Sequence, residues 1–204
     1  MKKDFINVTA IGILVGLLAQ PILANVPALE NALAGNNALI RIGVLIAFAV
    51  LAPLALYMAY LLGKIIPVLY QFGKFAAVGV LNTFVDVGVF NLETFMYGAV
   101  PTGTMFAVMK GISFIGATTN SFFWNKYWTF KANGTAKAGE TIKFYIVAIG
   151  GFLINVGVST LVFKSGGVNP SPLWTNILSP AAGVAGAFLW DFLGYKFVVF
   201  AKKK

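Results

Sequence analysis

The sequence predicts an all-α membrane protein with six transmembrane helices, and its composition is the first reason. Of the 204 residues, 59% are hydrophobic and 10% are charged, whereas a soluble domain is about 45–50% apolar and about 25% charged. The apolar residues form successive runs of about 20 residues, enough for a helix to cross the hydrocarbon core. The basic residues fall mainly between these runs, which is typical of membrane topology.

Two of the six helices form an added N-terminal pair over residues 1–66. The first run, Phe5–Ala24, follows a basic start and is interpreted as an uncleaved transmembrane helix, although a signal peptide has the same plan. The second run, Ile42–Leu62, contains Pro53, which predicts a kink. Because the pair carries few polar side chains, we expect it to pack on the other helices and not to line a site.

The remaining four helices form a domain over residues 67–204. Residues Lys64–Gln71 are expected to be a short linker or an interfacial segment, and the longest basic loop is Asn125–Lys143. The four expected helices are Phe75–Met96, Thr104–Trp124, Phe144–Phe163 and Trp174–Val199.

The distribution of basic residues predicts the orientation. The side of the N-terminus has most of the lysines, including those of the loop Asn125–Lys143 and the C-terminal Lys202–Lys204, whereas the opposite side has Arg41 and Lys164. The positive-inside rule then places both termini in the cytoplasm, in a multi-pass protein of the cell membrane.

An internal repeat relates the four helices of the domain. A shift of 69 residues brings Lys74 and Phe75 onto Lys143 and Phe144, and Asp86 onto Asn155. A shift of 70 brings Lys126 onto Lys196, and Phe130 onto Phe200. Each unit has two helices, so both enter the membrane from the same side. The repeat is expected to be parallel, with its pseudo-axis along the membrane normal.

Two motifs within this domain resemble those of the GtrA-like family of small four-helix membrane proteins. The first runs from Phe72 through Gly73-Lys74-Phe75 to Asp86, and the second runs from Asn120 to Phe130. The resemblance covers about residues 72–200. It implies a role in handling polyprenyl-phosphate-linked sugars, either by flipping them for cell-surface glycosylation or as the membrane anchor found in some polyprenyl-phosphate mannose synthases.

Polar side chains at membrane depth suggest a site between the third and fourth helices. Asn82, Asp86 and Glu93 share one face of the third helix by their spacing. Because charges inside a bilayer are costly, we expect Lys110 to pair with Asp86 or Glu93. Lys110, Asn120 and Trp124 lie along one face of the fourth helix, and Asn155 of the fifth is expected to close the cavity.

The interpretation of this site stays open between two alternatives. It is either a polar cavity for a sugar head group, with Trp124 or Trp128 stacking on the sugar, or a buried Asp86–Lys110 pair that fixes helix packing. Asn125 and Lys126, with Lys196 in the second repeat, are candidates to hold a lipid phosphate, since lysine binds phosphate as a point charge. Ordinary membrane anchoring explains each lysine equally well.

Several function classes are excluded or disfavoured. The chain has no Cys and no His, which removes thiolate and imidazole chemistry and the commonest transition-metal ligands. We expect a non-enzyme with no metal site, no cofactor and no nucleic-acid partner. Its partners are expected to be the lipid bilayer, a polyprenyl-phosphate sugar and, in the scaffold hypothesis, a glycosyltransferase. Small residues from Ala181 to Ala187 favour close helix contact, within the chain or in a homo-oligomer.

Overall fold

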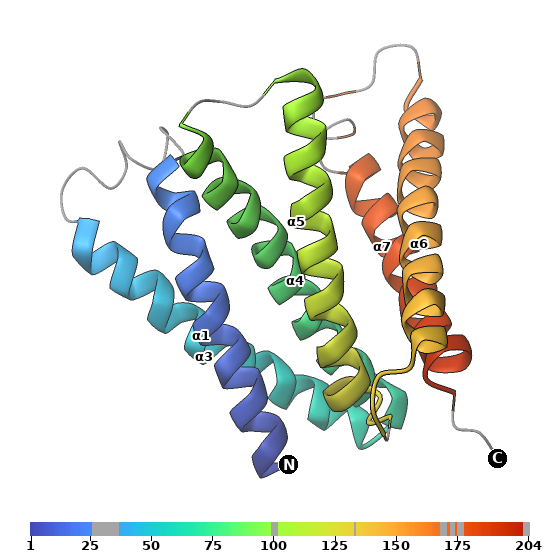
Figure 1. The fold of residues 1–204 in the computed structure, drawn as a ribbon. Coiled ribbons are helices and arrows are strands. Elements are labelled where there is room, and N and C mark those ends of the chain that lie inside the picture. The colour runs from blue at the N-terminus through green and yellow to red at the C-terminus, as the bar shows by residue number, and fades with distance from the viewer. Residues whose placement is uncertain are drawn as a thin grey trace. The chain divides into compact units, whose positions relative to one another are not determined.

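The protein is helical, as expected. The computed structural model describes residues 1–25, 37–98, 102–132, 134–167, 171, 174 and 178–201. Within these residues there are six long helices and no strand (Figure 1). The helices are α1 (Lys2–Asn25), α3 (Asn37–Gly63), α4 (Pro67–Tyr97), α5 (Gly103–Trp124), α6 (Ala138–Ser165) and α7 (Ser179–Gly194).

The long helices have the dimensions of membrane spans. In the described part of the chain, five helical segments are long and apolar enough to cross a bilayer: Lys2–Pro21, Ala38–Gly63, Pro67–Tyr97, Ala138–Ser165 and Ser179–Val199. The 22 residues of α5 give it sufficient length, but it carries Lys110, Asn120 and several hydroxyl side chains that lower its hydropathy. The predicted all-α, multi-pass architecture is therefore confirmed, although α5 is not among the five apolar spans.

The starts of two helices differ most from the expected ones. Helix α4 begins at Pro67, because proline suits the first turn of a helix, where its missing N–H is not needed. The expected linker Lys64–Gln71 is therefore reduced to the turn Lys64–Ile66. Helix α6 begins at Ala138, where the backbone N–H of Lys137 donates to Glu140 at 3.4 Å. The expected start of the sixth helix near Trp174 falls partly outside the described residues.

The chain divides into two compact units, Met1–Lys131 and Ala132–Lys204. In the first, α1 packs against α3 and α4, and α4 packs against α5. Val8, Ile11 and Val15 lie on one face of α1 and are at most 2% exposed; they meet Leu56, Val78, Leu81 and Trp128 in one core. The expected packing of the N-terminal pair on α4 is confirmed, whereas the domain boundary near residue 66 remains a prediction.

The second unit is a tight hairpin of α6 and α7. Gly183 lies so close to Ser159 and to the carbonyl of Asn155 that no side chain fits there, and Gly194 meets Val147 in the same way. The small residues of α7 therefore serve a contact within the chain at these positions, as expected where helix backbones approach closely.

A five-residue π-helix ends each unit's last helix. In the first unit it is η1 (Asn125–Thr129), and in the second it is η3 (Tyr195–Val199), 70 residues further on. The N–H of Phe130 donates to Asn125 at 2.9 Å, and that of Phe200 donates to Tyr195 at 2.8 Å. The rings of these phenylalanines lie 6.3 Å from Phe75 and 6.1 Å from Phe144, respectively. Both units thus end with the same arrangement of π-helix and phenylalanine contact, in agreement with the sequence repeat.

Candidate functional site

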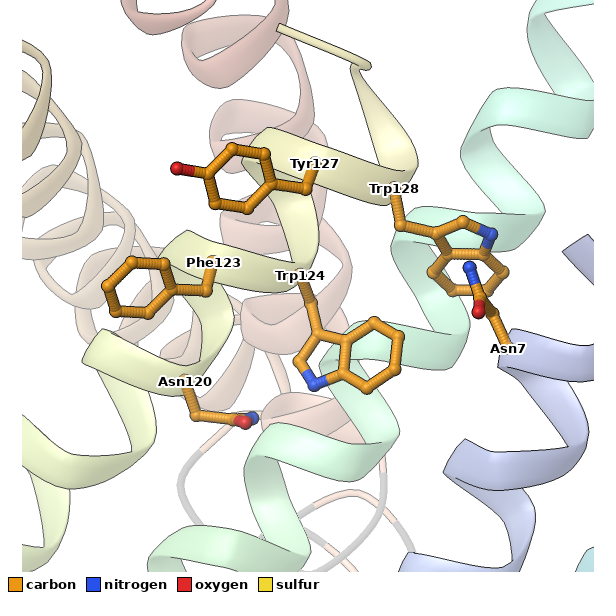
Figure 2. Close-up of a pocket in the computed structure, with 6 residues that line it drawn as sticks. All are labelled: Asn7, Asn120, Phe123, Trp124, Tyr127 and Trp128. Atoms are coloured by element: carbon orange, nitrogen blue, oxygen red, sulfur yellow. The ribbon is translucent and has the colours of Figure 1, made fainter. Parts of the chain in front are cut away.

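An open pocket of about 310 Å³ lies in the first unit, where α1 faces the end of α5 and the π-helix η1 (Figure 2). A pocket of this size is at the lower end of the range for small-molecule sites. Aromatic rings and carboxamides line it, and none of the described residues that line it is charged. The lining residues are Asn7, Asn120, Phe123, Trp124, Tyr127 and Trp128.

Helical spacing explains why five of these six residues meet. From Asn120 the next lining residues come three and four positions on, at Phe123 and Trp124, and the same steps from Trp124 lead to Tyr127 and Trp128. Residues three and four positions apart are neighbours on a helix surface, so all five lie along one face of α5 and η1. The Trp124 and Trp128 rings are 5.8 Å apart in an edge-to-face arrangement. The Phe123 and Tyr127 rings are stacked at 6.3 Å. In Figure 2 the two indoles point toward α1, where Asn7 lies beside Trp128.

One amide nitrogen in this pocket has no hydrogen-bond partner among the described residues. The Nδ2 of Asn120 is buried, and no atom of the described residues accepts a hydrogen bond from it. A buried donor without an acceptor costs about 1–3 kcal/mol. A ligand hydroxyl that accepted this hydrogen bond would recover that cost, which makes Asn120 a candidate binding residue.

A buried ion pair lies next to the pocket. Asp4 at the start of α1 pairs with Lys74 of α4 at 2.7 Å, and the two side chains are 10% and 4% exposed. The Asp4 carboxylate also accepts hydrogen bonds from the Tyr70 hydroxyl at 3.0 Å and from Trp128 Nε1 at 2.9 Å. The Lys74 ammonium lies 4.6 Å from the Tyr70 ring centroid. Asp4 thus connects α1 to both α4 and η1.

Sequence reasoning missed Asp4, Lys74 and Asn7, although two signals were available. An acid in the first turn of an apolar helix needs a cation, and Lys74 is a basic residue at the same side of the predicted membrane. The N-terminal pair was expected not to line the site, yet Asn7 of α1 contributes to this candidate pocket. The few polar residues of α1 are concentrated at the end that meets η1.

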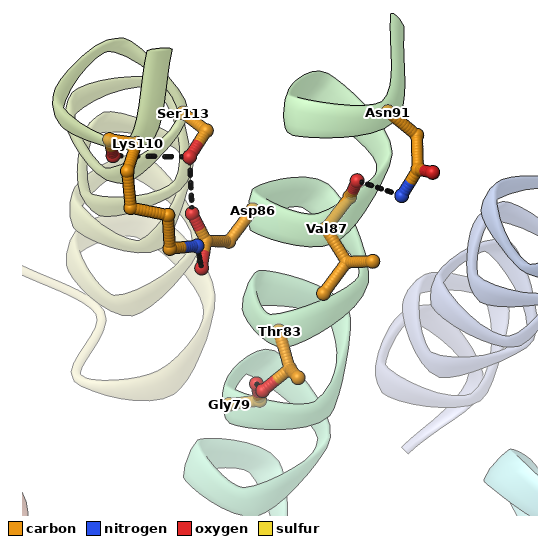
Figure 3. A network of polar contacts seen from close by, with 7 residues as sticks. All are labelled: Gly79, Thr83, Asp86, Val87, Asn91, Lys110 and Ser113. Carbon is orange, nitrogen blue, oxygen red and sulfur yellow. Dashed lines mark hydrogen bonds and ion pairs between the residues drawn. The ribbon is translucent and has the colours of Figure 1, made fainter. Parts of the chain in front are cut away.

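Lys110 pairs with Asp86, one of its two expected partners. Lys110 Nζ lies 2.5 Å from Asp86 Oδ2, and the Ser113 hydroxyl donates to Asp86 Oδ1 at 2.7 Å (Figure 3). Glu93 is not the partner of Lys110, and its Oε2 is buried without a hydrogen bond within the described residues. Neither Asp86, Lys110, Glu93 nor Asn82 lines the aromatic pocket, whereas Asn120 and Trp124 do.

Because both oxygens of Asp86 have protein partners, we expect Asp86→Asn to lower thermal stability by about 1 kcal/mol, the upper end for a partly exposed pair. The variant leaves Lys110 without a counter-charge. Adding Lys110→Met should restore the melting temperature in detergent, and sugar-lipid binding should stay unchanged throughout. If Asp86→Asn alone keeps normal stability but binds a sugar lipid weakly, Asp86 instead contacts the head group.

The π-helix turns Asn125 and Lys126 inward. Both are fully buried. The Nδ2 of Asn125 donates to Ser121 Oγ at 3.1 Å, and the Lys126 ammonium lies 5.8 Å from the Tyr127 ring centroid. A lipid phosphate would therefore have to reach Lys126 inside the protein, since the ammonium is not presented on the surface. The proposed phosphate role of Asn125 and Lys126 remains a prediction.

The other two candidates, Asn155 and Lys196, belong to the second unit. The Lys196 ammonium lies 5.6 Å and 5.3 Å from the ring centroids of Phe192 and Phe197. Among the described residues no ion pair joins it to Asp191, whose carboxylate instead lies against Gly151. The expected approach of Asn155 and Lys196 to the sites of the first unit stays a prediction.

Comparison with known proteins identifies the family. The model of the GtrA/DPMS transmembrane domain matches residues 74–200. The chain belongs to the GtrA/DPMS transmembrane domain family. It is also 28% identical over 128 residues to the uncharacterized membrane protein YngA of Bacillus subtilis (strain 168), an alignment that covers 63% of this chain and 78% of YngA. No solved structure matches the chain significantly.

The matched GtrA/DPMS domain contains most of the pocket but not all of it. It includes every lining residue of α5 and η1, and it includes Lys74. Asn7 and Asp4 lie outside it, in α1. The polar residues of α1 are therefore additions to the family's domain.

Proposed function

We propose that this protein is a membrane translocase, or carrier, for a polyprenyl-phosphate-linked sugar in cell-surface polysaccharide synthesis, and that it is not an enzyme. Membership of the GtrA/DPMS family supports handling of such lipids. The orientation proposed from the lysines, with both termini cytoplasmic, would let the protein receive its substrate at the inner leaflet.

The observation that carries the proposal is the chemistry of the aromatic pocket. A pyranose ring has a face of C–H groups that packs on aromatic rings, and its hydroxyls both donate and accept hydrogen bonds. Trp124 and Trp128 offer such rings, and the carboxamides of Asn7 and Asn120 offer a donor and an acceptor each. Because the part of the chain that the structure describes places no charged side chain in the pocket lining, a neutral head group leaves no unpaired charge there.

The position of the pocket suits a lipid-linked ligand. On its α1 side the pocket is lined by a helix with the length and composition of a membrane span, and on its other side by the 22-residue helix α5 and by η1. The pocket is open on one side. A sugar can occupy it while the attached polyprenyl chain stays in the surrounding hydrocarbon. This arrangement needs no cavity large enough for the whole lipid, which agrees with the modest volume of about 310 Å³.

A membrane anchor or scaffold that recruits a glycosyltransferase is the second candidate. The exposed lysines of the segment that follows η1, Lys131, Lys137 and Lys143, favour it, because they offer a basic surface to a cytosolic partner. The family description includes DPMS beside GtrA. However, an anchor has no need of a pocket that holds a buried, unsatisfied amide, so the translocase explains more of the structure.

Reconstitution separates the two candidates. The purified full chain is placed in phospholipid vesicles with a short-chain prenyl-phosphate glucose, and the fraction of sugar exposed outside is measured over time. We expect the protein to equilibrate this lipid between leaflets much faster than in empty vesicles, and to leave a bulk phospholipid probe unaffected. A rate equal to that of empty vesicles would refute the translocase and favour the anchor.

A further inference from the structure

We infer that helix α1 completes the head-group pocket: Asn7 contacts the sugar, and Asp4 is a positioning residue that holds the Trp128 indole in place. This inference rests on the proposed function, and it extends the site beyond residues 74–200, the part matched by the family. It assigns a specificity role to a helix that sequence reasoning had treated as support.

The position of Asn7 is the first observation. It lines the pocket from α1, and in Figure 2 its carboxamide lies beside Trp128, facing the same space as Trp124. Asn7 is half-buried, so its polar end is accessible to a ligand in the pocket. Asn7 and Asn120 approach this space from different helices, which would let them hold hydroxyls on two sides of one sugar ring.

The second observation is the anchor of Trp128. The indole Nε1–H donates to Asp4 Oδ1 at 2.9 Å, and the Trp128 side chain is 4% exposed. An indole has a single donor, so this hydrogen bond fixes which edge of the ring faces Asp4 and which faces the pocket. Asp4 is held in turn by Lys74 at 2.7 Å and by Tyr70 at 3.0 Å.

Holding an aromatic ring before the ligand arrives improves binding, because less conformational freedom is lost on association. The hydrogen bond from Trp128 to Asp4 therefore fixes the orientation of the Trp128 indole. The edge-to-face contact between Trp128 and Trp124 then restricts the orientation of the Trp124 indole as well. By this route α1 influences affinity for the sugar without Asp4 touching it.

The test of Asn7 compares two probes. Binding of a short-chain prenyl-phosphate glucose, and of the same prenyl phosphate without sugar, is measured on the full chain labelled with 5-fluorotryptophan. The chain has four tryptophans. In the unmodified protein we expect the sugar probe to shift the fluorine resonances of Trp124 and Trp128 and to leave those of Trp174 and Trp190 in place.

Asn7→Ala should weaken binding of the sugar probe roughly three- to tenfold, the effect of one lost hydrogen bond, and should leave the sugar-free probe unchanged. Thr9→Val, a similar polar deletion on the same helix outside the pocket lining, should change neither. Equal losses for both probes, or no loss for Asn7→Ala, would overturn the role of Asn7.

The test of Asp4 uses two matched double variants, Asp4→Asn/Lys74→Met and Asp4→Leu/Lys74→Met. Both remove the ion pair, and only the first keeps an oxygen that accepts a hydrogen bond from Trp128. The asparagine variant should bind the sugar probe within about twofold of the unmodified protein, whereas the leucine variant should lose roughly three- to tenfold and shift the Trp128 resonance. Equal affinities in the two variants would refute the positioning role.

These measurements also distinguish failure of the inference from failure of the proposed function. If the sugar probe shifts neither Trp124 nor Trp128 in the unmodified protein, the pocket does not bind the head group and the proposed function loses its site. If both resonances shift but Asn7 and Asp4 variants behave like Thr9→Val, only the inference about α1 is wrong.

Discussion

Lys74→Met is expected to destabilise the protein by about 3–5 kcal/mol, the usual cost of removing one partner from a buried ion pair. The Asp4 and Lys74 side chains are 10% and 4% exposed, so solvent would compensate little of the lost charge. Asp4 would keep its hydrogen bonds from Tyr70 and Trp128, but its negative charge would remain buried without a cation. The measurement is the melting temperature of the purified protein in detergent.

Two variants control this experiment. Lys64→Met removes an exposed lysine that lies 5.2 Å from the Tyr60 ring centroid and should change stability by no more than about 0.5 kcal/mol. The double variant Asp4→Leu/Lys74→Met should recover most of the lost stability, since replacing a whole buried pair by apolar residues is often neutral. If Lys74→Met has the same melting temperature as the unmodified protein, the Asp4–Lys74 ion pair does not stabilise the packing of α1 against α4.

The fold was largely predictable because its signals are strong and local. Apolar runs define α1, α3, α4 and α6 without any knowledge of tertiary contacts. Helix α4 ends at Tyr97, one residue beyond the expected Met96, and the Gly98 that follows adopts a left-handed conformation with φ 74° that favours glycine. The predicted start of α4 was too late, because the polar residues Lys64 and Gln71 indicated a linker between them. The structure instead begins the helix at Pro67, a residue suited to the first helical turn.

The π-helices show why the lysine roles were harder to predict. Lys126 follows an apolar helix and precedes a basic loop, a pattern that indicates a residue at the membrane surface. The π-helix widens the turn and brings Asn125, Lys126, Trp128 and Thr129 all into buried positions. π-Helices are rare, and an apolar run with helical periodicity predicts an α-helix instead. The burial of these four side chains therefore could not be predicted from the sequence.

The candidate site was predictable only within one helix. Helical spacing was enough to predict that Asn120 and Trp124 share one face of α5. The cost of a charge inside the membrane was enough to predict that Lys110 has an acidic partner. The choice of Asp86 over Glu93 depends on the register between α4 and α5, which sequence periodicity does not determine. Asn7 and Asp4 lie more than 100 residues from Trp128, and their contact depends on how α1 packs against the core.

Trp124→Ala is expected to cause the largest loss of sugar-lipid binding, about 2 kcal/mol or roughly thirtyfold, as for a central aromatic residue at a binding site. Trp124 is half-buried and lies between Asn120 and the ring of Trp128 (Figure 2), so its truncation removes the surface on which a pyranose would stack. The sugar-free prenyl phosphate should bind almost as before, because it lacks the ring that uses this surface.

Trp124→Phe and Trp190→Ala sharpen this prediction. Phenylalanine keeps an aromatic face and should restore part of the affinity, which a role of Trp124 in hydrogen bonding would not allow. Trp190 lies in the second unit, where its Nε1 donates to Val147 at 3.0 Å, and its removal should change stability but not the ratio of affinities for the two probes. A Trp124→Ala protein that still prefers the sugar-bearing lipid as strongly as the unmodified protein would exclude the aromatic pocket as the head-group site.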